Sequence, residues 1–386
     1  MLLNCCYCPY FRTILKYVHH FANIAKRNLN VDILRSVALI YMIMYHVYVL
    51  TGIEFSSKLI NSILSMGGEV GVSCFFVISG YSIYQCISKK YVSYFDFLKD
   101  RFKRIAPHYY ISIFLVLFFT EGAQYLCKQQ FLNIIAHLLF LHPLNPCWQG
   151  AISGVLWTMG VIFEFYMIAP ILKKIIDKYP KITLISSILL VVVAKYFIFS
   201  TINKNSSNSI LLFIYGRQIY TTINAFVIGM LVAKIQNNYK LQTNVIGQSM
   251  CIFGIFVLVL DGSGYISTFS ANSIYSFSLK GIVWHICLES IIGLYIFFSQ
   301  KNIWNNLIKK ILLFISRHEY SIYVWHLLLI NKIVGYSPIY MTVRNNCPKL
   351  CFIIVFIIAM AIPYFIDLFV SSIDYNQVKK QIINLR

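Results

Sequence analysis

The sequence predicts an all-α integral membrane protein with about ten transmembrane helices and both termini in the cytoplasm. Hydrophobic residues make up 59% of the chain and charged residues only 12%, against roughly 25% charged residues in a soluble domain. Apolar runs of about 20 residues, the length that crosses a bilayer, recur along the chain. The basic residues that give the net charge of +20 lie between these runs, where such residues orient a membrane protein. We therefore expect no nucleic-acid partner.

Basic residues are concentrated in alternate connections between the apolar runs. They occur before the first run and after the second, fourth, sixth, eighth and tenth. Because basic connections stay in the cytoplasm, this alternation requires an even number of spans with both ends inside. The segment 131–142 is too short to span, and we expect it to be external or re-entrant. The predicted spans are 33–52, 68–88, 105–121, 153–172, 182–201, 213–233, 243–261, 281–299, 311–332 and 350–370.

The chain divides into three parts. Residues 1–31 form a cytoplasmic segment without the uninterrupted apolar core of a secretory signal. Its apolar residues recur at helical spacing beside basic ones, which is typical of a helix lying on the membrane surface. Residues 32–372 form the transmembrane domain, and residues 373–386 a short basic cytoplasmic tail.

The eleven cysteines give little evidence for a metal site. Cys5, Cys6 and Cys8 lie in the predicted cytoplasmic segment, where thiols stay reduced, and no matching His/Cys cluster follows them. Cys127 and Cys147 flank a predicted external loop, and the sequence leaves their pairing open. We therefore predict no metal.

The first predicted span carries two ionisable residues, Arg35 and His46. Eleven residues make about three helical turns, so both project from nearly the same face, roughly 16 Å apart along the axis. A charge at the bilayer centre costs roughly 3 kcal/mol even on mild scales, and such residues usually face a protein interior or a wet cavity. The alternatives are an Arg35 that reaches the headgroups and a His46 that forms an interhelical hydrogen bond.

Five sequence blocks occur in the order found in one family. The first contains Asp32, Arg35 and, ten residues after the arginine, His46. The pattern resembles acyltransferase family 3, the multi-pass membrane O-acyltransferases of bacteria. The other blocks are GGEVGVSCFFVISGYSI at 67–83, FLKDRFKRIAPHYY at 97–110, LWTMGVIFEFYMIAP at 156–170 and EYSIYVWHLLLI at 319–330.

The resemblance has two departures. Ser73 stands where the family often has an aspartate, and Ile162 stands where it usually has a glutamate. A glutamate occurs two residues later, at Glu164, which is about half a helical turn away. Glu164 is a candidate catalytic residue, and the alternative is a carboxylate that pairs with an arginine or histidine inside the bundle.

The resemblance implies acyl transfer from a thioester to a hydroxyl group. His46 would be the base, since histidine titrates nearest neutrality. Arg35, Arg101 and Arg104 would bind the phosphates of an acyl-CoA, because the arginine fork suits bidentate phosphate contacts. The alternative for Arg101 and Arg104 is ordinary anchoring on the cytoplasmic side.

Three further polar residues lie in late predicted spans. His326 is expected to line the cavity of the acyl acceptor or to play a structural role. His285 and Glu289 are four residues apart and share a helix face. A metal site there would need more ligands than the sequence offers, so we interpret them as an internal polar pair.

The family implies an O-acetyltransferase of the cell (inner) membrane that uses acetyl-CoA to acylate a carbohydrate, such as a surface polysaccharide. The expected partners are the bilayer, the acyl-CoA and the carbohydrate acceptor. Because we expect no external hydrolase-like domain after the last span, transfer ends within the membrane or passes to a separate transferase partner. The alternatives are a transporter or flippase for a lipid-linked oligosaccharide, and a polysaccharide polymerase, which would normally have a larger external loop.

Overall fold

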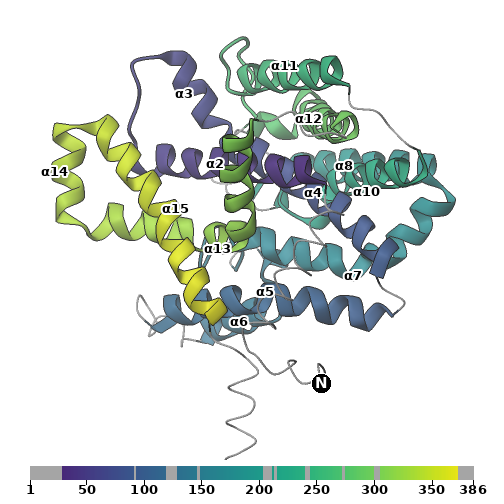
Figure 1. The fold of residues 1–386 in the computed structure, drawn as a ribbon, viewed down its shortest axis with the longest axis horizontal. Helices are drawn as coiled ribbons and strands as arrows, with labels where there is room; N and C mark the ends of the chain where they lie inside the picture. The colour runs from purple at the N-terminus through teal and green to yellow at the C-terminus, as the bar shows by residue number, and fades with distance from the viewer. Residues whose placement is uncertain are drawn as a thin grey trace, which may run out of the picture.

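The computed structural model is all-helical in the residues it describes, as the sequence predicts. These residues are 28–90, 93–118, 128–145, 148–202, 211–212, 215–239, 244–271, 274–299 and 305–372. Figure 1 shows the arrangement of the helices, with α11 and α12 at one edge of the molecule and α5 and α6 at the opposite edge. The helices are α2 (Leu29–Thr51), α3 (Lys58–Ser65), α4 (Gly67–Lys90), α5 (Tyr94–Val116), α6 (Lys128–Leu138), α7 (Trp157–Lys178), α8 (Pro180–Ile202), α10 (Ile219–Asn238), α11 (Val245–Gly262), α12 (Leu279–Phe298), α13 (Asn306–Tyr336), α14 (Pro338–Asn346) and α15 (Pro348–Ser372), with the 3₁₀ turns η3 (His142–Leu144) and η5 (Ile274–Phe277).

Each predicted span overlaps a long helix of the described chain. Seven stretches of the described chain are long and apolar enough to cross a membrane: α2, the continuous stretch Lys58–Lys89, α8, α10, α11, α12 and α15. The remaining three predicted spans coincide with α5, α7 and α13, which carry more ionisable residues. Only 17–28% of the most apolar windows of α8, α11 and α15 is buried. Their large exposed side chains, such as Phe253 at 67% exposure, suit contact with lipid. The chain is a multi-pass membrane protein.

The ends of α2 follow from its flanking residues. The Asn28 side chain accepts a hydrogen bond from the backbone N–H of Asn30, which satisfies one of the unpaired donors at the helix start. At the other end Gly52 adopts a φ of 60°, a left-handed conformation that terminates helices and favours glycine. These caps fix the length of the helix that carries Arg35 and His46.

The centre of the bundle depends on a close approach between α4 and α10. A Cβ atom on Gly80 would lie 2.0 Å from the backbone oxygen of Phe226, and one on Gly229 would lie 1.9 Å from that of Val77. Only glycine permits this backbone-to-backbone contact, which is a common device between membrane helices. On its other side α4 packs on α2, and α2 packs on α13. These contacts fix how the core helices are oriented relative to α4.

The segment 131–142 does not form a spanning helix, in agreement with its length. Its residues fall in α6, the following turn and the start of η3. Tyr109 of α5 donates a hydrogen bond of 2.8 Å to the backbone oxygen of His137, and the rings of His137 and His142 stack 4.2 Å apart. Burial lowers the pKa of His137 to about 4 and that of His142 to about 3, so both rings are neutral at pH 7. The hydrogen bond from Tyr109 therefore holds this segment against α5.

Three predictions lie outside the described residues. They are the amphipathic segment up to residue 27, the basic tail 373–386, and the pairing of Cys127 with Cys147.

Candidate functional site

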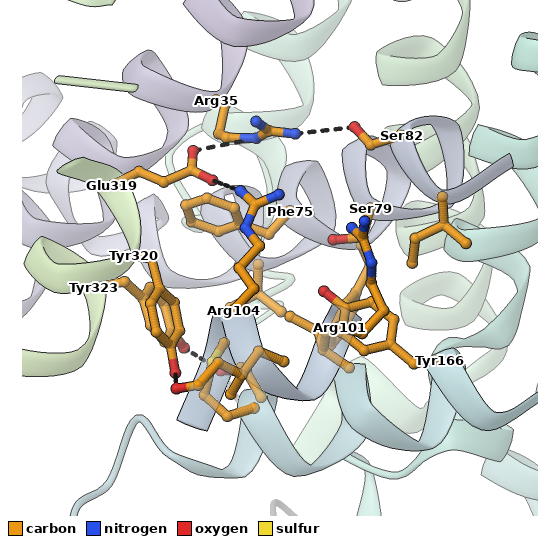
Figure 2. Close-up of a pocket in the computed structure, with 17 residues that line it drawn as sticks. Arg35, Phe75, Ser79, Ser82, Arg101, Arg104, Tyr166, Glu319, Tyr320 and Tyr323 are labelled. Atoms are coloured by element: carbon orange, nitrogen blue, oxygen red, sulfur yellow. Dashed lines mark hydrogen bonds and ion pairs between the residues drawn. The ribbon is translucent and has the colours of Figure 1, made fainter. Parts of the chain in front are cut away.

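Three predicted site residues, Arg35, Arg101 and Arg104, line one cavity, which we call the arginine cavity (Figure 2). It encloses about 840 Å³ including its open side. Arg35 comes from α2, whereas Arg101 and Arg104 come from the first half of α5. The fold therefore brings together guanidinium groups that are more than 60 residues apart in the sequence.

Arg35 is held in one orientation by three helices. Its Nε atom lies 3.1 Å from Oε2 of Glu319, and Nη1 lies 3.3 Å from Oδ1 of Asp32. Nη2 donates a 2.9 Å hydrogen bond to the hydroxyl of Ser82. The residue is only 8% exposed. These contacts place Arg35 in the protein interior rather than among lipid headgroups, and its ion pairs and hydrogen bonds restrict its orientation.

Arg104 is held more loosely, whereas Arg101 contacts residues of α4 and α5. Nη2 of Arg104 lies 4.0 Å from Oε1 of Glu319, and more than half of its side chain is exposed. Arg101 donates to the sulfur of Cys86 at 3.2 Å, and its guanidinium lies 5.6 Å from the centre of the Phe97 ring. The lining thus has three arginines and one glutamate, an excess of positive charge that attracts an anionic ligand.

Glu319 is a site residue that the sequence analysis missed, although it opens the fifth block. Figure 2 shows its carboxylate between Arg35 and Arg104, and it forms an ion pair with each. An ionisable residue within a predicted span is itself a sign of an internal role. That signal was present in the sequence, but the pairing of Glu319 with Arg35 and Arg104 could not be read from it.

His46 lines a second cavity of about 950 Å³, which we call the histidine cavity. The predicted polar pair of α12 lines it too, and Glu289 accepts a hydrogen bond from the side chain of Asn224. Glu69 lies close enough to Arg217 and Lys195 for electrostatic interaction, as does Lys195 to Glu289. The ionisable residues of the lining are Tyr45, His46, Glu69, Lys195, Arg217, His285, Glu289 and Tyr323.

Glu69, Lys195 and Arg217 were not predicted as site residues. Each lies within or next to an apolar run, so the cost of burying a charge could have marked them individually. Arg217 covers the ring of Trp157 at 4.8 Å. The charges of the two acids and two cations balance, unlike those of the arginine cavity.

His326 lies directly behind His46, with ring centres 5.1 Å apart. Its Nδ1 atom is 2.7 Å from the backbone oxygen of Tyr323. A carbonyl only accepts, so Nδ1 carries the proton and Nε2 presents a lone pair. Among the described residues Nε2 has no hydrogen-bond partner. His326 is fully buried and is not part of the cavity wall, so its substrate-binding role stays a prediction.

The two cavities meet at three side chains. Val72 and Phe76 of α4 and Tyr323 of α13 line both. The Tyr323 hydroxyl forms a hydrogen bond with Thr158 and donates another of 3.1 Å to the backbone oxygen of Val155. The arginines and His46 therefore lie on opposite sides of a shared wall.

Glu164, the predicted catalytic carboxylate, lines neither cavity. It is buried in α7, and neither carboxylate oxygen has a hydrogen-bond partner among the described residues. Ile162, at the position where the family usually has glutamate, does line the arginine cavity. The two-residue displacement thus turns the carboxylate away from the cavity wall, and a catalytic role for Glu164 stays a prediction.

Sequence comparison decides the family. The chain matches the acyltransferase domain of acyltransferase family 3 over residues 28–368. The chain belongs to this family. Its matched region includes every predicted site residue, so the resemblance carried by the five blocks is confirmed.

The chain is also similar to curated proteins of Staphylococcus aureus. It is 24% identical over 344 residues to "Putative O-acetyltransferase SACOL0978" of strain COL, covering 79% of this chain and 51% of that protein. It is 22% identical over 333 residues to O-acetyltransferase OatA of strain NCTC 8325, covering 80% of this chain and 52% of OatA. The chain thus spans about half the length of these relatives. No solved structure matches the chain.

Proposed function

We propose that this chain is an inner-membrane O-acyltransferase that moves an acyl group, most simply acetyl, from acyl-CoA to a hydroxyl of a carbohydrate. One observation carries the proposal. The arginine cavity and the histidine cavity share the wall formed by Val72, Phe76 and Tyr323. A cavity lined by three arginines and a cavity with a candidate base therefore share lining residues within a member of an acyltransferase family.

The arginine cavity is the donor site in this proposal. Coenzyme A carries several phosphate charges, and an arginine binds phosphate through two parallel N–H donors. Arg101 and Arg104 lie in the basic first half of α5, next to Lys99 and Lys103. With ten spans and both termini inside, this end of α5 faces the cytoplasm, where acyl-CoA is made.

The histidine cavity is the acceptor site. His46 takes the proton from the acceptor hydroxyl as its oxygen attacks the thioester carbonyl carbon. The C–O bond forms, the C–S bond breaks, and the proton passes to the departing thiolate of coenzyme A. The aromatic and balanced polar lining, including Tyr45 and Trp157, suits a sugar ring with its hydroxyl groups.

The test compares acyl transfer with transport. Purified protein in proteoliposomes is supplied with acetyl-CoA, and release of the coenzyme A thiol is measured with native glycan acceptor present. Mass spectrometry of surface glycans from cells with and without the chain identifies the acetylated product. We expect thiol release and acetylated glycan, both lost in His46→Ala. Movement of a lipid-linked oligosaccharide without thiol release would support the transporter instead.

A further inference from the structure

The wall between the two cavities is apolar. Val72 and Phe76 are four residues apart on α4 and so lie on the same face of the helix, and Tyr323 approaches them from α13. Charged side chains line the cavities on both sides of this wall, but none of the three shared residues is charged. We call these three side chains the junction.

Phe76 is fixed in place by other aromatic rings. It is 2% exposed, and its ring meets Trp157 at 6.1 Å and Phe165 at 5.7 Å, edge to face in both cases. Phe165 in turn stacks on Phe226 at 4.3 Å. Because interiors are close-packed, turning Phe76 aside would displace this whole cluster. The junction is rigid on the α4 side.

Tyr323 is fixed from the other side. Its hydroxyl is hydrogen-bonded to Thr158 and to the backbone oxygen of Val155. Its ring meets Phe75 edge to face at 5.7 Å, and Figure 2 shows both rings at the wall of the arginine cavity. Moving Tyr323 would break two buried hydrogen bonds, which is costly.

We propose that Val72, Phe76 and Tyr323 form an acyl filter, which admits short uncharged acyl groups to His46 and rejects longer or anionic ones. This inference rests on the proposed function, since the acyl carbon must cross the junction while coenzyme A stays on the arginines. A succinyl group would bring a carboxylate among uncharged rings, where an unpaired charge is strongly disfavoured. Each added methylene must displace packed side chains. The filter therefore acts on transfer and not on binding of the coenzyme.

The first experiment uses the unmodified protein in proteoliposomes with native glycan acceptor. Acetyl-, propionyl-, butyryl- and succinyl-CoA are compared by thiol release and by binding in detergent. We expect similar Kd values for all four, because the arginines hold the shared coenzyme. We expect thiol release to fall about tenfold or more per step from acetyl to butyryl, with succinyl slowest.

The second experiment changes the junction. Val72→Ala should raise the rate with butyryl-CoA relative to acetyl-CoA by about tenfold, whereas Val72→Phe should abolish transfer and leave coenzyme A binding intact. Val193→Ala on the exposed face of α8 is the matched control and should leave the acyl preference unchanged.

The outcomes separate the two proposals. Equal thiol release from all four donors, or an unchanged preference in Val72→Ala, would overturn the filter and leave the acyltransferase standing. If Val72→Ala cannot be purified, the four-donor series on the unmodified protein decides. If none of the four donors is consumed, the proposed function is wrong and the filter with it.

Discussion

The arginine cavity and the histidine cavity differ mainly in charge balance. Three arginines face one glutamate in the first, whereas two acids, Glu69 and Glu289, face two cations, Lys195 and Arg217, in the second. Asp32 and Glu319 pair with Arg35, but the arginines still outnumber these acids, and an excess of positive charge favours an anion. A compensated cavity avoids the cost of isolated buried charges while keeping many hydrogen-bonding groups. This difference supports the proposed function, with a phosphate-bearing donor in the arginine cavity and an uncharged hydroxyl acceptor in the histidine cavity.

The largest expected effect concerns the base. His46→Ala should lower acyl transfer by about 10²–10⁴-fold, the usual contribution of general base catalysis. Coenzyme A affinity should not change, because His46 lines only the histidine cavity. Thiol release and Kd measured on the same preparation check this. A rate near that of the unmodified protein would remove His46 from the mechanism.

The next effect concerns the donor arginines. Arg101→Ala and Arg104→Ala should each weaken coenzyme A binding roughly tenfold to hundredfold, since hydrogen bonds to charged groups contribute about 1.5–3 kcal/mol. Arg→Lys should restore only part of the affinity because the fork is lost.

The matched control for the arginines is Lys99→Ala. Lys99 is an exposed cation of the same helix that does not line the cavity. Calorimetry in detergent gives the three affinities. Equal losses for Lys99→Ala and for the arginine variants would mean that general charge, and not the cavity, attracts the coenzyme.

The two cavities should also open to opposite sides of the membrane. In a background from which the eleven native cysteines have been removed, Arg104→Cys should react faster with a thiol reagent supplied from the cytoplasm than with one supplied from outside. His46→Cys should react preferentially from outside. Labelling of both positions from the cytoplasm alone would mean that donor and acceptor enter by one route.

A smaller effect is expected from a contact behind the arginine cavity. Asp367 of α15 accepts from Nε2 of His108 on α5 at 2.8 Å and from Nδ1 of His318 on α13 at 2.5 Å. It thereby joins the helix of Arg101 and Arg104 to the helix of Glu319. Asp367→Leu should weaken coenzyme A binding roughly threefold to tenfold, because it acts only through helix position.

Asp367→Asn, which keeps an acceptor oxygen, should retain most of the affinity. The control is Asp261→Leu. It removes a carboxylate of α11, at the edge of the molecule opposite α5, that pairs with Lys280. If the Asp367→Leu protein binds coenzyme A normally, the contacts of Asp367 do not contribute to the donor site.

The sequence by itself determined the membrane class, the helical segments and the family. It also placed Arg35 and His46 together on α2. These follow from local properties: the length of apolar runs, the order of short blocks and the 100° periodicity of one helix. Such properties do not depend on how helices pack, so each expected segment overlaps a helix of the described residues and the family assignment is confirmed.

Only the tertiary structure determined which side chains face one another and which cavity they line. It set Glu319 between Arg35 and Arg104, turned Ile162 and not Glu164 toward the arginine cavity, and gathered Glu69, Lys195 and Arg217 around His46. The rotation of each helix determines these contacts. That rotation is set by close approaches such as Gly80 against Phe226 and Gly229 against Val77, between segments about 150 residues apart. Periodicity within one helix carries no information about its neighbour's face, so the junction of the two cavities could not be predicted from the sequence.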